Sequence, residues 1–385
     1  MLKKIKTLFV LSMLIAFMGV PLFASGNKEE AKSTSVTVEE QLPMTHEELV
    51  AAAKKEGKVV VYSATSRIAA AGEGFTAKYG IEVESTNLKD YELIEKVSKE
   101  NSIGVKGADF VLAQDGGRVM GELINLGYLY SYVPEDLKNV IPEQYQSPLT
   151  FCIINKLFIF NNEDSTVEPF DNIWALTTPE WAGKFQFKHP FQESVNANFL
   201  TTITKPEIAD KIAIAYKDYF KKDIVLTTPN AGYEWIKALY ENDLVVTTSD
   251  TKTAESVGIR GQHEAENAGL FVYNKLRYVD SKNLALQAMY NVEPFSGFYY
   301  PIYALMCSNA QNPAAAKLFI EYLLTEEGFE PWSQDIGTYS PNPNISINEN
   351  DFPVSFWENI LVDEDPAYCF ENRANVEEFL NEYLY

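Results

Sequence analysis

Short apolar runs alternate with longer amphipathic segments through most of this chain. The run VVVYSAT at 59–65 has the length and content of a buried strand, and the flanking segments, 44–58 and 68–80, have the apolar spacing of helices. A second strand is predicted at 81–86, directly after the second helix. Strands that alternate with helices predict βαβ units, a mostly parallel sheet and right-handed crossover connections.

The same alternation continues toward the C-terminus. The run FCIINKLFIFN at 151–161 is apolar at almost every position, which indicates a strand buried on both faces. The segment 312–328 has Asn312 as a candidate N-cap and Pro313 at the first helical position, so a helix ending at Gly328 is predicted. The remaining predictions are helices at 87–104, 118–129, 206–223 and 231–243, and strands at 108–117, 185–187, 244–250, 269–279 and 297–308.

The first 24 residues have the composition of a secretory signal peptide. Three lysines precede an apolar stretch, Leu8–Val20, and a small residue, Ala24, marks the expected cleavage site. The apolar stretch is short for a membrane span of about 20 residues, so cleavage is favoured over the alternative, retention as an anchor. No cysteine lies near the cleavage site, so no lipid anchor is expected, and 25–44 is predicted to be a flexible tether. The mature protein is therefore expected in the periplasm or outside the cell.

Charge and cysteine usage narrow the classes of partner. The formal net charge of -22 at pH 7 disfavours nucleic acid and anionic membranes as partners, although an anionic ligand can still bind where local donors gather. The three cysteines, Cys152, Cys307 and Cys369, lie in apolar surroundings without CxxC spacing. Three buried free thiols are expected, and a single disulfide is the alternative.

Four predicted strand ends carry polar, flexible residues: YSATSR at 62–67, LAQDGG at 112–117, KHPFQESVNANF at 188–199 and TTSDTK at 247–252. In open α/β sheets, ligands bind outside the carboxyl ends of the strands, near the helix starts that follow. A cleft that gathers all four segments is therefore predicted. The candidate ligand-binding residues are Ser63, Thr65, Ser66, Arg67, Asp115, Gly116, His189, Glu193, Ser194, Asn196, Ser249, Asp250, Thr251 and Tyr299.

These residue types suit a small anion. Hydroxyls near 63–66 and the N–H groups of the following helix can hold an anion, and Arg67 can add a charge-assisted pair. His189 can donate to a ligand oxygen, and Asp250 can accept from a sugar hydroxyl or an amine. For each cluster the alternative is an ordinary helix cap. No catalytic residue, metal site or cofactor is expected.

Several of these segments together resemble the extracellular solute-binding proteins of bacterial ABC importers, in particular the ferric-iron and AfuA-like group. The segments are VVVYSAT, ADFVLAQDGG, GYLYSYVPEDLKNVIPEQY, WALTTPEWAGKFQFKHP and NPAAAKLFIEYLLTEEGFEPWSQDIGTYSPNPN, of which PEWAGK and NPAAAKLFIEYLL are the most specific. The resemblance implies an α/β, type II periplasmic-binding fold, in which two lobes close on a small solute. It also implies a monomer that delivers the solute to a membrane permease.

The signal peptide at 1–24 and the tether at 25–44 precede the two lobes that the resemblance implies. The expected organisation of the lobes is the first part of lobe 1 at 45–150, a crossover at 151–161, lobe 2 at 162–296, and the return crossover, the rest of lobe 1 and C-terminal helices at 297–385.

The solute is predicted to be anionic, such as a phosphorylated sugar or a phosphonate. Iron-binding members of the group resemble one another in a pair of adjacent tyrosines that hold Fe3+, but the corresponding place here reads LVVTTSDTKTAES. Tyr299 and Tyr300 are adjacent but fall later in the chain. Fe3+ remains the alternative ligand, with Asp115, Glu193 and Asp250 as possible oxygen ligands.

Two other classes of exported protein, a hydrolase and an adhesin, are less favoured by the sequence. An exported hydrolase is less favoured, because no GxSxG or HExxH motif fixes a mechanism, and the chain is not expected to be an enzyme. An exported adhesin would be favoured by repeats or low-complexity stalks, and neither is present.

Overall fold

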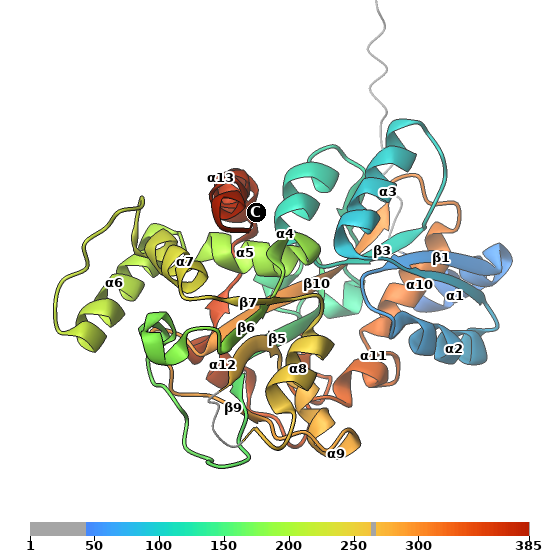
Figure 1. Cartoon of the computed structure of the whole chain (residues 1–385). Helices are drawn as coiled ribbons and strands as arrows, with labels where there is room; N and C mark the ends of the chain where they lie inside the picture. Colours follow the sequence, from blue (N-terminus) through green and yellow to red (C-terminus); the bar gives the residue numbers. More distant parts are fainter. Residues whose placement is uncertain (1–43, 263–266, 385) are drawn as a thin grey trace, which may run out of the picture. The chain divides into compact units, whose positions relative to one another are not determined.

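The strand and helix alternation predicted from the sequence is present in the computed structural model, which describes residues 44–262 and 267–384 (Figure 1). The signal peptide and, apart from Met44, the tether lie outside these residues. The opening helix α1 (His46–Glu56) begins at a capping box formed by Thr45 and Glu48 and ends at Gly57, whose φ is 76°. Its start and end therefore follow from the local sequence.

The first three strands form a parallel group with helices on both faces. Strand β1 (Lys58–Ser63) pairs with β2 (Glu82–Asn87) and with β3 (Phe110–Ala113), in parallel in both cases. The helices between them are α2 (Ile68–Tyr79) and α3 (Asp90–Ser102). Parallel pairing brings the carboxyl ends of all three strands to one edge of the sheet.

Two long strands occupy the centre of the sheet. Strands β5 (Thr150–Phe160) and β10 (Gly297–Cys307) pair in antiparallel fashion, and the main path of the sheet runs β2-β1-β3-β10-β5-β8-β6-β7. Both strands are buried along nearly their whole length, as the continuous apolar run of the first predicted. The sheet is therefore parallel in its two outer groups and antiparallel between them.

The second outer group has the same design as the first. Strand β6 (Phe185–Lys188) pairs in parallel with β7 (Val245–Thr247) and with β8 (Ala268–Val272). Its helices are α5 (Ser194–Thr202), α6 (Pro206–Phe220), α7 (Ala231–Glu241) and α8 (Asp250–Gly258). Four shorter strands pair at the margins: β4 (Leu129–Ser131), β9 (Gln287–Ala288), β11 (Thr338–Tyr339) and β12 (Val362–Asp363).

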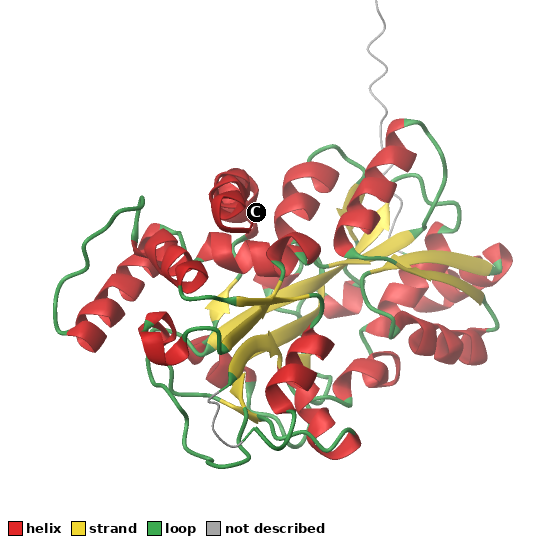
Figure 2. Ribbon diagram, in the orientation of Figure 1, coloured by secondary structure: helices red, strands yellow, loops and turns green. Residues whose placement is uncertain are grey.

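Helices cover both faces of the sheet (Figure 2). Around β1 and β3, one face packs on α1, α2, α10 (Pro313–Leu323) and α11 (Glu326–Ser333), and the other face packs on α3. Around β6 and β8, one face packs on α5, α6, α7 and the C-terminal helix α13 (Pro366–Leu384), and the other on α8 and α12 (Val354–Ile360). The sheet thus has two sets of hydrophobic cores, one on each side of the central strands.

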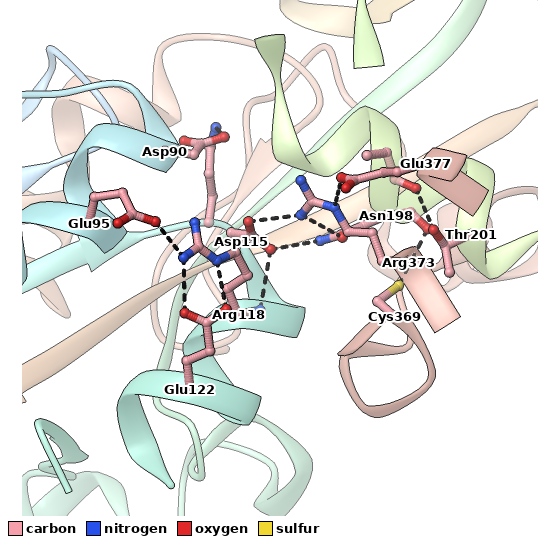
Figure 3. A network of polar contacts seen from close by, with 12 residues as sticks. Asp90, Glu95, Asp115, Arg118, Glu122, Asn198, Thr201, Cys369, Arg373 and Glu377 are labelled. Carbon is pink, nitrogen blue, oxygen red and sulfur yellow. Dashed lines mark hydrogen bonds and ion pairs between the residues drawn. The ribbon is translucent and has the colours of Figure 1, made fainter. Parts of the chain in front are cut away.

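Helix α13 connects the two outer groups through a buried polar network (Figure 3). It packs against both α4 (Gly116–Arg118), which follows β3, and α5, which follows β6. Arg373 of α13 donates to Asp115 Oδ2 at 2.9 Å and to Asn198 Oδ1 at 3.3 Å, and Asn198 Nδ2 donates to Asp115 Oδ1 at 3.3 Å. The two groups therefore meet directly beneath this helix.

Three element predictions were wrong in detail. The helix predicted at 118–129 is the short α4 followed by a π-helix, Val119–Ile124. The helix predicted at 312–328 is two helices, because Thr325 caps a second helix, α11, and Gly328 lies inside that helix. The strand predicted at 269–279 ends at Val272 and continues as a 3-10 helix, Tyr273–Arg277, and then α9 (Tyr278–Ser281).

Two further features agree with the sequence. The three cysteines are free and buried, as predicted. Among the described residues, no helix has the length and apolar content that a membrane span requires.

Candidate functional site

A pocket of about 350 Å³ lies where the carboxyl ends of the two parallel groups face each other. Thr65, Ser66 and Arg67 line it after β1, and Asn87 and Gln114 line it at the ends of β2 and β3. From the other group come Lys188, Glu193, Ser249, Asp250, Thr251, Asn274, Lys275 and Arg277, and the central strands add Ile154, Tyr300 and Ile302. The pocket therefore occupies the position where open α/β sheets bind ligands.

The lining is rich in basic side chains. Arg67, Lys188, Lys275 and Arg277 line the pocket together with two carboxylates, Glu193 and Asp250. This local excess of positive charge stands in a chain whose formal net charge is -22. Burial lowers the pKa of the Lys275 ammonium, so its charge is incompletely compensated by the groups around it.

A buried lysine joins the central strand β5 to the second group. The side chain of Lys156 is fully buried, and its Nζ lies 2.6 Å from Glu193, 2.8 Å from Asn196 and 3.1 Å from Asp250. Burial disfavours the ammonium, but Asp250 and Glu193 outweigh that effect and raise the pKa of Lys156. Burial likewise disfavours the Asp250 carboxylate, but Lys156 and Lys188 lower its pKa. The Asp250 carboxylate is thereby held charged at the floor of the pocket.

One carboxylate links two arginines of the pocket. Asp335 Oδ2 accepts from Arg67 after β1 and, at 2.8 Å, from Nη1 of Arg277 after β8. Arg67 also donates to the carbonyl of Trp332 at 3.2 Å. The side chains of Arg67 and Asp335 are 23% and 15% exposed, so the contact is largely desolvated. Arg67 therefore has a nearby carboxylate partner and also lines the pocket.

Half of the predicted ligand residues come together here. Thr65, Ser66, Arg67, Glu193, Ser249, Asp250 and Thr251 all line the pocket. Ser63 lies just behind it, and its hydroxyl is used inside a turn, donating to the Thr65 carbonyl at 2.9 Å. Asn196 lies in the buried network around Lys156, at the floor.

Other predicted residues lie away from this lining. Asp115 and Gly116 are covered by the α13 network, where Asp115 accepts from Arg373. His189 caps a 3-10 turn by accepting from the N–H of Phe191, and burial lowers its pKa. Ser194 is buried at the first position of α5.

The adjacent tyrosines point to opposite faces of β10, as strand alternation requires. Tyr300 lines the pocket, and its burial holds the pKa of the phenol well above its usual range. Tyr299 packs with Tyr339 and Trp357 in the core on the other face. The two phenols therefore cannot meet at one ligand in this arrangement.

Several further lining residues are not among the predicted ones: Asn87, Gln114, Lys188, Asn274, Lys275, Arg277 and Tyr300. Gln114 and Lys188 lie inside two of the four polar strand ends, so their segments did have a signal in the sequence. Lys156 also had a signal, because it is the single charged residue in the apolar run 151–161. Lys275 and Arg277 had no such signal, because the pattern of their segment, 269–279, predicts a continuous strand.

A second cavity of about 420 Å³ lies between α6 and the segment 358–366. It is lined by Lys205 and Asp365, which pair at 2.9 Å, and by loop residues. It gathers none of the four polar strand ends, so we assign the functional site to the pocket at the strand ends. Within residues 44–262 and 267–384, no three histidine, cysteine, aspartate or glutamate side chains are placed to hold a metal ion.

The fold is that of type II periplasmic-binding proteins. No protein-family model matches the chain, and no curated protein matches it in sequence. Solved structures do match: iron-bound HitA from Pseudomonas aeruginosa has a TM-score of 0.67 at 16% identity, over 85% of this chain and 99% of that one.

Two further matches differ in the ligand that their descriptions name. A ferric binding protein from Campylobacter jejuni has a TM-score of 0.65 at 18% identity, over 85% of this chain and 99% of that one. The periplasmic binding protein AfuA from Actinobacillus pleuropneumoniae, with fructose-6-phosphate bound, has a TM-score of 0.63 at 18% identity, over 85% and 98%. At these identities the likeness establishes the fold, and the ligand has to be argued from the pocket.

Proposed function

We propose that this chain is the solute-binding receptor of an ABC import system and that it captures a small anionic solute, such as a phosphorylated sugar or a phosphonate. The observation that carries the proposal is the gathering of Arg67, Lys188, Lys275 and Arg277 around one pocket in a strongly acidic chain. Guanidinium and ammonium groups in a partly desolvated pocket make strong charge-assisted hydrogen bonds to phosphate-like oxygens.

The proposed mechanism is binding without chemistry. The groups around β1 and β6 act as two lobes, with β5 and β10 as the crossover strands between them, and closure around the solute expels water from the pocket. The protein is exported, works as a monomer and delivers the solute to a membrane permease. The matches from Campylobacter jejuni and Actinobacillus pleuropneumoniae are described as binding proteins, which supports a receptor over an enzyme.

Fe3+ is the second candidate, because two of the matched structures are described as iron-bound or ferric-binding. The pocket offers Glu193, Asp250 and Tyr300 as oxygen ligands. Two observations disfavour it. Both carboxylates are already engaged by Lys156, and the raised pKa of Tyr300 opposes formation of a phenolate.

Isothermal titration calorimetry of the mature protein tests the proposal. Fructose 6-phosphate, 2-aminoethylphosphonate, methyl phosphate and ferric citrate are titrated separately, each against the wild type and Arg67→Ala. We expect at least one of the phosphorus anions to bind, and Arg67→Ala to weaken that binding by about 2 kcal/mol, because a buried charge-assisted contact is lost.

Lys106→Ala is the matched control. Lys106 is exposed before the amino end of β3, away from the pocket, so its removal changes the net charge equally but should leave affinity unchanged. Binding of iron with a visible tyrosinate charge-transfer band, and of none of the phosphorus anions, would replace the proposal by the ferric alternative. An equal loss of affinity in Arg67→Ala and Lys106→Ala would show that long-range charge, and not the pocket, sets the affinity.

A further inference from the structure

Two residues that line the pocket each have a buried side-chain oxygen atom without a hydrogen-bond donor. Among the described residues, no group donates a hydrogen bond to Asp250 Oδ1 or to Asn274 Oδ1. Each of these two residues is 8% exposed, and both line the same pocket. Buried acceptors of this kind are rare in native structures, and each calls for a specific explanation.

The surrounding protein does not account for them. Lys156 Nζ lies 3.1 Å from Asp250 Oδ1, but its hydrogen bonds go to Asp250 Oδ2, Glu193 and Asn196. These three bonds use all three protons of the ammonium. The backbone of Asn274 is engaged, because its carbonyl accepts from Arg277 at 2.9 Å, whereas the side-chain oxygen is not.

The pocket therefore has two kinds of surface. Arg67, Lys188, Lys275 and Arg277 supply donors and positive charge, and Asp250 and Asn274 supply unused acceptors. A simple anion has acceptor atoms for the first surface but nothing to offer the second. A solute that also has O–H or N–H groups satisfies both surfaces.

Resting on the function proposed above, we propose that the solute carries hydrogen-bond donors in addition to its anionic group, and that Asp250 Oδ1 and Asn274 Oδ1 accept from these donors. Hydroxyl and ammonium groups share this chemistry. The solute class is thus a polyhydroxylated or amino-substituted phosphate or phosphonate, and donor-free anions should bind more weakly.

The test compares probes with and without such donors at pH 8.5, where phosphate monoesters are fully ionised. Fructose 6-phosphate carries hydroxyls, 2-aminoethylphosphonate carries an ammonium, and methyl phosphate carries neither. We expect at least one donor-bearing probe to bind 10-fold or more tightly than methyl phosphate, since one hydrogen bond to a charged or buried acceptor is worth about a factor of ten.

Asn274→Ala tests whether the tighter binding of the donor-bearing probes depends on Asn274 Oδ1, and it leaves the network around Lys156 intact. It should weaken the donor-bearing probe about tenfold and leave methyl phosphate unchanged. Asn274→Asp distinguishes a hydroxyl donor from an ammonium donor, because the added negative charge should favour 2-aminoethylphosphonate over fructose 6-phosphate. Circular dichroism and the melting temperature check that both variants are folded.

The outcomes separate the two proposals. If methyl phosphate binds as tightly as the other two probes, or if Asn274→Ala weakens all three equally, the donor requirement is wrong while anion capture stands. If no phosphorus anion binds and ferric citrate does, the proposed function fails and this inference fails with it.

Discussion

At the scale of single residues, Lys156 has the largest expected effect on stability. Replacing it by Met removes the buried ammonium that lies between Glu193 and Asp250, so that Lys188, 3.2 Å from Glu193, is left to compensate both carboxylates. Because breaking a buried ion pair on one side is strongly destabilising, Lys156→Met should lower the free energy of unfolding by about 3 to 5 kcal/mol. Urea denaturation followed by fluorescence measures this change.

The control for this substitution is Lys106→Met, which removes an exposed lysine and should change stability by less than about 0.5 kcal/mol. A Lys156→Met protein as stable as the control would mean that the network contributes nothing to the fold. A double variant, Lys156→Met with Glu193→Gln, should have a higher free energy of unfolding than Lys156→Met alone, because one of the two buried carboxylate charges is removed.

The buried carboxyl group of Asp90 should make the stability of the protein depend on pH. Burial raises the pKa of its carboxyl to about 7, with Gln114 donating to it at 3.0 Å and Glu193 adding repulsion. The folded state then binds a proton that the unfolded state releases near its usual value of 3.8, so stability falls as pH rises from about 4 to about 7.

Asp90→Asn should remove this contribution. Its melting temperature should exceed that of the wild type by less at pH 5 than at pH 8, because most of the wild type's loss of stability falls between pH 5 and pH 7 and the amide never carries the buried charge. Differential scanning calorimetry at both pH values measures the difference. The opposite order at pH 8 would show that the ionised carboxylate is stabilised by partners in the fold.

Residue-level chemistry was predictable where a side chain sits directly at a strand end. Thr65, Ser66, Arg67 and Asp250 were predicted from their position alone, and they line the pocket. Arg277 and its partner Asp335 were not predictable, because they are 58 residues apart and meet through tertiary packing. Nothing in either local sequence signals the other.

At the scale of elements, the start of β10 depends on a glycine. Gly297 has a φ of 149°, and a Cβ there would lie 2.1 Å from the carbonyl oxygen of Lys156 on the neighbouring strand β5. Gly297→Ala should therefore destabilise the protein by about 3 kcal/mol or more, from backbone strain and from the contact with β5. Thermal and urea unfolding provide the measurement.

Gly80→Ala separates the two causes. Gly80 also has a positive φ, 70°, but nothing lies within 4 Å of the added Cβ. It should cost about 1 to 2 kcal/mol, from the left-handed conformation alone. Equal costs in the two variants would mean that β5 moves aside and that the pairing at this end of β10 is loose.

The order of elements was predictable, and their ends were less so. Apolar spacing and caps placed α1, α2 and α7 within a few residues. The break between α10 and α11 was missed because the apolar spacing continues through it, while Thr325 starts a new helix by accepting from the N–H of Gly328. Local pattern alone cannot distinguish one long helix from two that meet at a cap.

At the scale of the whole molecule, α13 holds α4 and α5 together. Asp115 is buried at 1% exposure and accepts from Arg373, which also contacts Asn198 of α5 (Figure 3). Arg373→Met should leave this carboxylate unpaired and lower the free energy of unfolding by about 3 kcal/mol. Hydrogen exchange should speed up at 115–124 and at 194–202 together, and not in α1.

Glu377→Gln is the matched control on the same helix. It removes the ion pair between Arg373 and Glu377 but keeps the contacts to Asp115 and Asn198, so exchange at the two segments should stay slow. Faster exchange at one segment alone in Arg373→Met would contradict a joint restraint by α13.

The α/β architecture and the position of the pocket followed from the sequence, because parallel strands bring their polar ends to one edge. The arrangement of α13 did not follow. Its buried contacts are with α4, α5 and α7, which lie far from it in the chain, so no local pattern indicates them.

The carboxylate shared by Arg67 and Arg277 has a consequence for which anions can enter the pocket. Chloride and other abundant, weakly basic anions must outcompete Asp335 for guanidinium protons that it already holds. A multiply charged oxyanion can make that exchange, whereas a halide gains too little from it. Under the function proposed above, Asp335 thereby keeps simple salts from occupying the pocket in place of the solute.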